Sequence, residues 1–271
     1  MDYIYETHLH TDKGSACSDT PGAEYVQKYM DAGYSGIIIT DHYFRGNCAV
    51  PKELPWEERV NRFCRGYEET AEEGYKRNFS VFFGWEERIH WDEYLVYGLD
   101  KKFMLAHPEM ESWTAADQIR EVRAAGGCVV QAHPFRAAWY ITDMVLHADC
   151  VDGIEGYNAG NHPEWNALAL RYAERLGLPV TGGSDNHHAA TMENDKLSGI
   201  VLKEPLREIG DLVRIIREKK PIGLHTPAGL PVWEKGMQPE LPAVLYGAGD
   251  RFVTDHPADY LDGKDFPGLL P

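Results

Sequence analysis

Two histidines, His8 and His10, stand two residues apart near the start of the sequence. Residues two apart on a β-strand point to the same face, so the two imidazoles can be presented side by side. Neutral imidazoles aimed at one point are good ligands for a transition metal. Pairs of this kind also occur on solvated surfaces, so the remaining sequence has to decide between a metal site and an exposed pair.

Further side chains that can bind metals follow short apolar runs, at the points where those runs end. They are Asp41, His42, Glu86, His133, Asp185 and His187. In a barrel of parallel strands the C-terminal rim carries the functional site, so we expect these residues to converge there. Packing does not explain the pattern, because unpaired charged groups are costly to bury.

The elements that must position these residues alternate between strands and helices. After an opening strand, apolar runs predict strands at residues 35–42, 80–86, 94–98, 128–134, 153–158, 179–185 and 199–202. Other stretches predict helices at residues 23–32, 56–76, 115–125, 139–147, 163–176 and 206–219. About seven β-α steps of this kind indicate a closed or nearly closed parallel α/β barrel. From Pro221 the chain is rich in Pro and Gly, so we expect a barrel over residues 1–220 and an irregular C-terminal extension over 221–271 packed on it.

The composition limits the classes of partner. The 271-residue chain has a formal net charge of −16, with 43% hydrophobic and 26% charged residues. Nucleic acid and anionic membranes would repel this charge, which argues against either as the main partner. No apolar run approaches the roughly 20 residues of a membrane span, and no secretory signal is visible. The five scattered cysteines form no Cys-x-x-Cys pair and predict free thiols in a reducing, cytoplasmic environment.

Five motifs follow one another across residues 3–203. They are Thr7-His8-Leu9-His10-Thr11, Thr40-Asp41-His42, Gly84-Trp85-Glu86, Gln131-Ala132-His133-Pro134 and Gly183-Ser184-Asp185-Asn186-His187. As a set, these motifs resemble the PHP (polymerase and histidinol phosphatase) superfamily of metal-dependent phosphoesterases. The resemblance implies a distorted (β/α)7 barrel with a cluster of two or three divalent transition-metal ions, zinc, manganese or iron, at its C-terminal rim.

The resemblance also implies a first metal position. His8 and His10 would bind this metal together with Asp185, and Glu86 would bridge it to another. Glu87 is the alternative to Glu86, but neighbours on a strand face opposite ways and the Gly-x-Glu match favours Glu86. The residues implied as catalytic are His8, His10, Glu86, Asp185 and His187.

Two further positions follow in the same way. His42 and His187 would hold a second metal, and His133 would belong to a third position that shares Glu86. Asp41 is expected to orient His42 rather than to bind metal itself.

Two ligands that many members of the superfamily carry have no clear match here. The first is a further His or Asp a few residues after the opening motif, where only Asp12, Cys17 and Asp19 are available. The second is a His between the bridging Glu and the His-Pro motif. Residues 92–98 contain none, which leaves His90 and His107 as stand-ins. The sequence therefore favours a two-metal site over a three-metal site.

The chemistry that follows is hydrolysis by a metal-activated water. Two metals about 3.5–4 Å apart can share a hydroxide and clamp the attacking and leaving oxygens of a phosphoryl group. Arg136 and Arg45 each follow a motif and are placed to bind phosphate oxygens, with Lys13 as a third candidate, although each could equally be a surface residue. We expect a small phosphorylated substrate. The alternative is an amidohydrolase-like hydrolase of a C–N or C–O bond, although no strand ends in a lysine that could bridge its metals.

Overall fold

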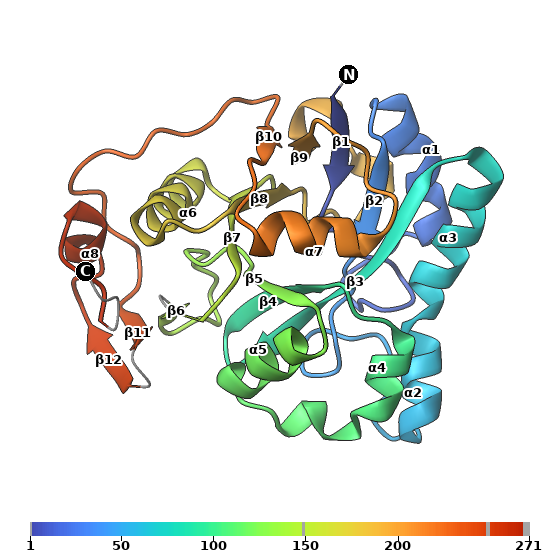
Figure 1. Ribbon diagram of the computed structural model, residues 1–271, viewed down its shortest axis with the longest axis horizontal. Helices are drawn as coiled ribbons and strands as arrows, with labels where there is room; N and C mark the ends of the chain where they lie inside the picture. Colours follow the sequence, from blue (N-terminus) through green and yellow to red (C-terminus); the bar gives the residue numbers. More distant parts are fainter. Residues whose placement is uncertain (1, 148–149, 248–249, 268–271) are drawn as a thin grey trace.

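The computed structural model describes residues 2–147, 150–247 and 250–267 and is built around one curved sheet (Figure 1). Within these residues the sheet contains nine strands, namely β1 (Tyr3–Glu6), β2 (Gly36–Ile39), β3 (Ser80–Ile89), β4 (Asp92–Tyr97), β5 (Cys128–Gln131), β7 (Gly153–Asn158), β8 (Val180–Gly183), β9 (Gly199–Leu202) and β10 (Gly223–His225). Their order across the sheet is β10-β9-β1-β2-β3-β4-β5-β7-β8.

Helices cover the outside of this sheet. They are α1 (Gly22–Asp31), α2 (Trp56–Phe63), α3 (Arg65–Arg77), α4 (Lys101–Ala106), α5 (Ala115–Ala124), α6 (Pro163–Leu176) and α7 (Ile209–Arg217), with short 3-10 turns at Pro108–Ser112, Ala189–Thr191 and Asn194–Lys196. In Figure 1, α1, α2 and α3 lie along one side and α6 lies on the other. The buried face of α7, formed by Leu212, Val213 and Ile216, shares a hydrophobic core with Tyr5 and Ile38 of the sheet.

Strand β8, at one edge of the sheet, approaches the end of β1 at the rim. There the Asp185 amide donates a hydrogen bond to the His8 carbonyl (2.9 Å), and the His10 amide donates one to the Asn186 carbonyl (3.1 Å). Gly183 permits this approach, because a Cβ at that position would lie 2.4 Å from the His8 Cβ. The sheet is therefore nearly closed and barrel-like, which confirms the predicted α/β barrel.

The barrel is distorted because its strands are not all parallel. β1, β2 and β3 run parallel to one another, as do β5, β7 and β8. β4 is antiparallel to both β3 and β5, and β9 is antiparallel to both β1 and β10. The first residues of β4 consequently lie at the same rim as the last residues of its parallel neighbours.

Two helix predictions differ from the structure. The single helix expected at residues 56–76 is interrupted between α2 and α3 at Cys64, which nevertheless keeps near-helical dihedral angles (φ −72°, ψ −9°). The prediction of a helix at residues 139–147 is wrong. Met144–His147 forms strand β6, which pairs in parallel with β11 (Ala243–Gly247).

A second sheet lies beside the barrel, at the left of Figure 1. It contains β6, β11 and β12 (Asp250–Thr254), and β11 is antiparallel to β12. The short helix α8 (Ala258–Asp262) joins α6 through a hydrogen bond from Arg171 Nε to the Leu261 carbonyl (2.9 Å). The described part of the segment after Pro221 is thus mostly irregular, as predicted, but it contains short strands and a helix that the sequence does not predict. Across the described ranges, no helix is both long and apolar enough to cross a membrane.

Candidate metal centre

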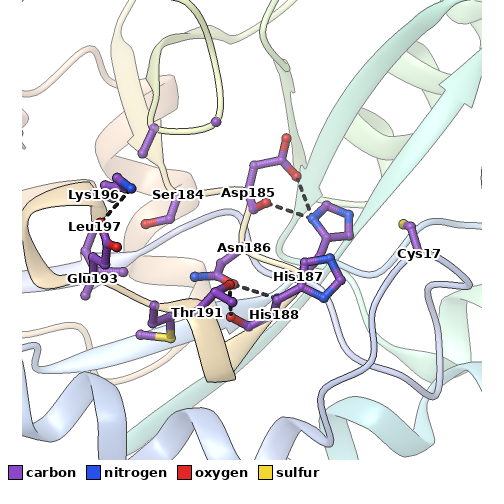
Figure 2. Close-up of a pocket in the computed structure, with 13 residues that line it drawn as sticks. Cys17, Ser184, Asp185, Asn186, His187, His188, Thr191, Glu193, Lys196 and Leu197 are labelled. Atoms are coloured by element: carbon purple, nitrogen blue, oxygen red, sulfur yellow. Dashed lines mark hydrogen bonds and ion pairs between the residues drawn. The ribbon is translucent and has the colours of Figure 1, made fainter.

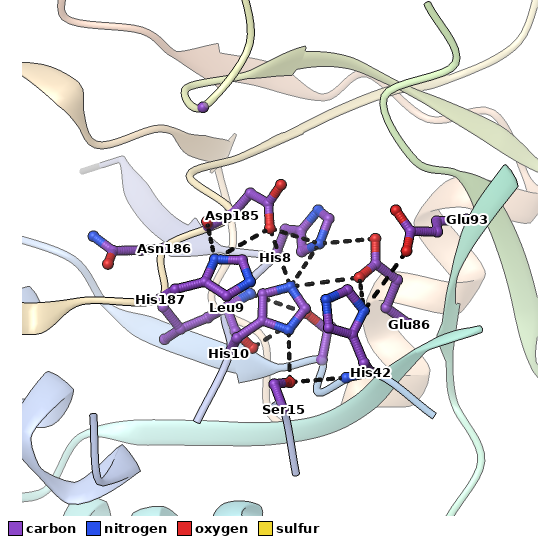
Figure 3. A network of polar contacts seen from close by, with 12 residues as sticks. His8, Leu9, His10, Ser15, His42, Glu86, Glu93, Asp185, Asn186 and His187 are labelled. Atoms are coloured by element: carbon purple, nitrogen blue, oxygen red, sulfur yellow. Dashed lines mark hydrogen bonds and ion pairs between the residues drawn. The ribbon is translucent and has the colours of Figure 1, made fainter. Parts of the chain in front are cut away.

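His8, His10 and Asp185 meet at one point on the rim, just beyond β1 and β8 (Figure 3). The Nε2 atoms of His8 and His10 are 3.1 Å apart. Asp185 Oδ1 lies 3.4 Å from His8 Nε2 and 3.1 Å from His10 Nε2. Glu86 on β3 places Oε1 3.2 Å from His8 Nε2 and Oε2 3.5 Å from His10 Nε2. The structure therefore brings together the four side chains predicted for the first metal position.

These spacings fit a metal ion. Four ligands about 2.05 Å from a tetrahedral zinc ion lie about 3.3 Å from one another. The donor atoms of His8, His10 and Asp185 lie 3.1–3.4 Å apart, whereas Glu86 meets His8 with Oε1 (3.2 Å) and His10 with Oε2 (3.5 Å). The four side chains are at most 5% exposed, so water does little to solvate their acceptor atoms. A cation between them would relieve that cost of burial.

Hydrogen bonds on the far side of each imidazole fix its orientation. His8 Nδ1 donates to Glu155 Oε1 on β7 (2.9 Å). His10 Nδ1 donates to Ser15 Oγ (2.9 Å), whose hydroxyl donates in turn to Asp41 Oδ1 (2.8 Å). Since Nδ1 carries the proton in both rings, each Nε2 presents its lone pair to the common point. Glu155 was not predicted from the sequence.

Contrary to the expectation, Asp41 does not contact the His42 ring. Its carboxylate accepts hydrogen bonds from the Thr11 amide and the Thr11 hydroxyl, both at 2.6 Å, and from Ser15 Oγ. Ser15 Oγ also accepts a hydrogen bond from the His42 amide (3.0 Å). Asp41 therefore holds the loop after β1 and reaches His42 only through Ser15.

A second position lies beside the first. His42 Nδ1 and Glu86 Oε2 form an ion pair 2.7 Å apart. A cation shared by these two atoms would replace the proton between them. His187 stacks on His10 with ring centroids 4.2 Å apart, and its Nδ1 donates to the Asp185 carbonyl (2.8 Å), which leaves Nε2 for a ligand. The residues predicted for the second position also come together.

A third group of donors surrounds His133. Its Nε2 lies 3.2 Å from Glu86 Oε1 and 3.6 Å from Oε2 of Glu93. The other oxygen of Glu93, Oε1, lies 3.8 Å from His42 Nδ1. Glu93 was not predicted. It occupies the segment where the superfamily resemblance implies a histidine, and it supplies a carboxylate that faces both neighbouring positions.

Two ends of strands in this centre have unusual backbone conformations. His133 after β5 has φ +26°, and Asp185 after β8 has φ +53°. Residues other than glycine rarely adopt a positive φ, because this backbone conformation costs about 1–3 kcal/mol for each such residue. Strain of this kind clusters at functional sites. Both residues face the cluster: His133 Nε2 lies 3.2 Å from Glu86 Oε1, and Asp185 Oδ1 lies 3.1 Å from His10 Nε2.

Cys17 lies in the segment after the opening motif where the superfamily resemblance implies a further metal ligand. Its thiol contacts the His187 and His42 rings, whereas Asp12 pairs with Lys13 and Asp19 pairs with His188. Burial raises the pKa of Cys17, but the contacts with the two imidazoles outweigh it and bring the pKa to about 6. Of the three residues left open by the sequence, Cys17 is the one that faces the cluster.

The buried acids and histidines of the cluster shift one another's pKa values in both directions. Burial raises the pKa of Glu86, but the neighbouring His8 outweighs it and holds that pKa well below its usual value; the same balance applies to the pKa of Asp185. Burial, aided by His187, holds the pKa of His10 well below its usual value. The carboxylates are therefore ionised and His10 is neutral, the states in which they bind metals. Burial lowers the pKa of His8, but Asp185 and the other neighbouring carboxylates outweigh it and hold that pKa well above its usual value, so a metal ion must displace a proton from this ring.

The three basic candidates differ in where they lie. Arg136 reaches the cluster, since its Nη2 donates to Asp185 Oδ2 (2.6 Å) and to Asn158 Oδ1 (3.2 Å). Arg45 instead contacts Glu87 Oε1 through Nε (2.9 Å) and the Trp113 carbonyl through Nη1. Lys13 pairs with its neighbour Asp12. The stand-ins His90 and His107 are not among the clustered donors of the described residues.

An open cavity of about 390 Å³ adjoins the cluster (Figure 2). Asp185, His187 and Cys17 line it on the side of the metal centre, and Lys196 and Glu193 line it across the opening. Its volume lies in the range of small-molecule sites, and its lining combines polar side chains with apolar ones such as Met192 and Leu197. A small polar substrate could therefore reach the converging donors from this side.

Comparison with known proteins agrees with this arrangement. The family described as PHP-associated matches residues 163–192. The fold is similar to that of a two-domain protein from Bacteroides vulgatus that contains a predicted PHP-like metal-dependent phosphoesterase, with a TM-score of 0.55 and 14% sequence identity. The alignment covers 83% of this chain and 65% of that protein, so this chain spans less than two thirds of its length.

Two further solved structures are similar. One is an amidohydrolase from Chromobacterium violaceum with bound sulfate and no metal (TM-score 0.51, 15% identity, covering 83% of this chain and 98% of that one). The other, from Bifidobacterium adolescentis, is provisionally named a metal-dependent phosphoesterase (TM-score 0.48, 18% identity, covering 80% and 96%). No curated protein matches the sequence significantly. The family match and the fold confirm the resemblance to the PHP superfamily that the motifs predict.

Proposed function

We propose that this protein is a metal-dependent hydrolase that cleaves a phosphate ester of a small molecule. The observation that carries the proposal is the spacing of the donor atoms of His8, His10 and Asp185, which lie 3.1–3.4 Å apart and fit one metal ion, with Glu86 beside them. Glu86 then turns its other oxygen, Oε2, to His42, whose Nδ1 lies 2.7 Å from it. One carboxylate shared between two ligand sets is the arrangement of a two-metal site.

The reaction would use a water molecule as its nucleophile. Metal ions bound here would polarise a phosphoryl oxygen and lower the pKa of water toward neutrality. The chain contributes fixed ligands, because Glu155 and Ser15 hold the His8 and His10 rings in the required tautomer. Arg136, anchored on Asp185, extends its guanidinium beside the cluster and would donate to an oxygen of the phosphoryl group.

Turnover of chromogenic substrates by the purified chain tests the proposal. The metal-free protein is loaded separately with zinc, manganese and iron(II), then assayed with p-nitrophenyl phosphate and bis(p-nitrophenyl) phosphate. We expect hydrolysis that chelation abolishes. The His8→Ala and Asp185→Ala variants should lose more than 100-fold of the activity together with bound metal, whereas His107→Ala, on an exposed segment outside the cluster, should keep both.

The same assay includes an amide and a carboxylic ester. Turnover of these substrates without turnover of either phosphate would replace the proposal by the amidohydrolase-like alternative. A fully metal-loaded protein that turns over none of the phosphate esters would refute the phosphoesterase proposal.

A further inference from the structure

A second cavity, of about 780 Å³, lies between the barrel and the sheet formed by β6, β11 and β12. Its walls come from the β3–β4 hairpin, from residues 112–116 at the start of α5, and from β6 and β11. The side chains that the argument uses are Arg45, Arg88, Tyr94, Trp113, Ala115 and Tyr246.

This cavity is on the opposite face of the hairpin from the metal centre. Successive residues of a strand alternate between the two faces. Glu86 and Glu93 point to the metal centre, so their neighbours Glu87 and Tyr94, which are paired across β3 and β4, point away from it. Tyr94 lines the second cavity, which is therefore separate from the site proposed for hydrolysis.

Two hydrogen-bond donors at this cavity lack partners. The Tyr94 hydroxyl and Nη2 of Arg45 are buried, and neither has a hydrogen bond to any residue that the structure describes. The other nitrogens of Arg45 are engaged by Glu87 and Trp113. Buried donors normally have acceptors, because an unsatisfied one costs about 1–3 kcal/mol. A ligand that brings an acceptor group would remove that cost.

The charge of the lining favours an anionic acceptor. Glu87 balances Arg45. Arg88 lies over the rings of Trp91 and Tyr140 at 5.3 and 5.1 Å and adds a cation to the same cavity, whereas burial raises the pKa of Asp92, the carboxyl group of the lining, well above its usual value and favours its neutral form. A carboxylate or sulfonate has several acceptor oxygens, which suits a wall that offers the free Arg45 nitrogen and the Tyr94 hydroxyl.

The remaining walls are aromatic. Tyr246 stacks on His147 with ring centroids 4.9 Å apart and an interplanar angle of 12°, and Tyr94 meets the same histidine edge-on at 5.7 Å. Trp113 lines the cavity from the segment before α5. Such walls suit a flat apolar body, and the volume is that of a typical small-molecule site.

We propose that this cavity binds a small planar aromatic molecule that carries one anionic group, at a site independent of the metal centre. The anionic group lies against Tyr94 and Arg45, and the aromatic body lies between Trp113 and Tyr246. This binding does not depend on the hydrolase activity proposed above.

Fluorescence titration of the full chain with 8-anilinonaphthalene-1-sulfonate, an aromatic anion, tests the proposal. We expect saturable binding at one site per chain. Indole-3-acetate should displace the probe at least tenfold better than its neutral analogue indole-3-acetamide. Ala115→Trp, which fills the cavity, should abolish binding, whereas Ala124→Trp, on an exposed position of the same helix, should leave it unchanged.

Two more variants keep the test decisive. Tyr94→Phe removes only the unpartnered hydroxyl and should weaken displacement by indole-3-acetate about fivefold to tenfold, even if Ala115→Trp fails to fold. His8→Ala should bind the probe as the unmodified chain does. Equal displacement by the two indoles, full binding in Ala115→Trp, an unchanged affinity in Tyr94→Phe, or loss of binding in His8→Ala would each overturn the proposal.

Discussion

Glu155 provides the sharpest test of how the centre is organised, because it touches no proposed metal position directly. Its Oε1 accepts from His8 Nδ1 at 2.9 Å, and its Oε2 accepts from the His133 amide at 3.1 Å and from Asn158 Nδ2 at 3.1 Å. Both oxygens face donors. In Glu155→Gln, the new amide nitrogen, itself a donor, must face one of these donors.

The size of the effect follows from this mismatch. A buried donor left without an acceptor costs about 1–3 kcal/mol. If His8 instead shifts its proton to Nε2 to accept from the amide, it loses the lone pair aimed at the metal. Removing a carboxylate that orients a metal-binding histidine weakens metal affinity roughly 10- to 100-fold, which is about 1.4–2.7 kcal/mol. The two estimates of the free-energy cost agree, so we expect the dissociation constant for zinc to rise 10- to 100-fold.

Competition with a chromophoric chelator measures this constant on metal-free protein. Glu164→Gln, an exposed glutamate on α6, is the matched control and should bind zinc as the unmodified chain does. Circular dichroism confirms that both variants are folded. Zinc affinity of folded Glu155→Gln within twofold of that of Glu164→Gln would refute the orienting role of Glu155.

Three other predictions concern residues around the centre. Glu93→Gln should lower the number of manganese ions bound per chain, measured by elemental analysis at saturation, while the first position stays filled; an unchanged stoichiometry would remove Glu93 from the ligand set. In metal-free protein, Cys17 should react with iodoacetamide at a rate that rises with pH through about 6 and then levels off, because the thiolate forms above that pKa. Saturating zinc should block this reaction, and a rate that climbs steadily to pH 9 would contradict the contact of Cys17 with the histidines. Arg136→Met should lower kcat/KM for p-nitrophenyl phosphate about 100-fold with metal content unchanged, and equal activity would exclude its contact with phosphate.

Residues at the ends of parallel strands were the part of the site that the sequence could predict. A parallel strand carries its last residues to the common rim, so His8, Glu86, His133 and Asp185 could be grouped without knowledge of strand order. The structure brings these residues together, while their binding of metal stays a prediction.

Glu93 could not be found by the same reasoning. It lies at the beginning of β4, and in a parallel barrel the beginning of a strand is at the end opposite the site. β4 is antiparallel to both neighbours, which carries Glu93 to the rim instead. Strand direction depends on pairing between distant segments, and local periodicity contains no signal for it.

The errors in the fold have the same origin. The sequence predicts a helix at β6 because the strand that pairs with it, β11, lies about a hundred residues later and this pairing cannot be inferred locally. Glu155 was overlooked because it stands inside an apolar run, where a single carboxylate gives no sign of the histidine that it contacts.

Anomalous scattering from crystals of the full chain grown with zinc tests the central claim most directly. The account predicts one peak about 2.1 Å from Nε2 of His8 and His10 and beside Asp185, and a second peak on the other side of Glu86 near His42. Two peaks bridged by Glu86 would establish the two-metal centre. Zinc bound elsewhere on the chain, with no peak among these donors, would contradict it.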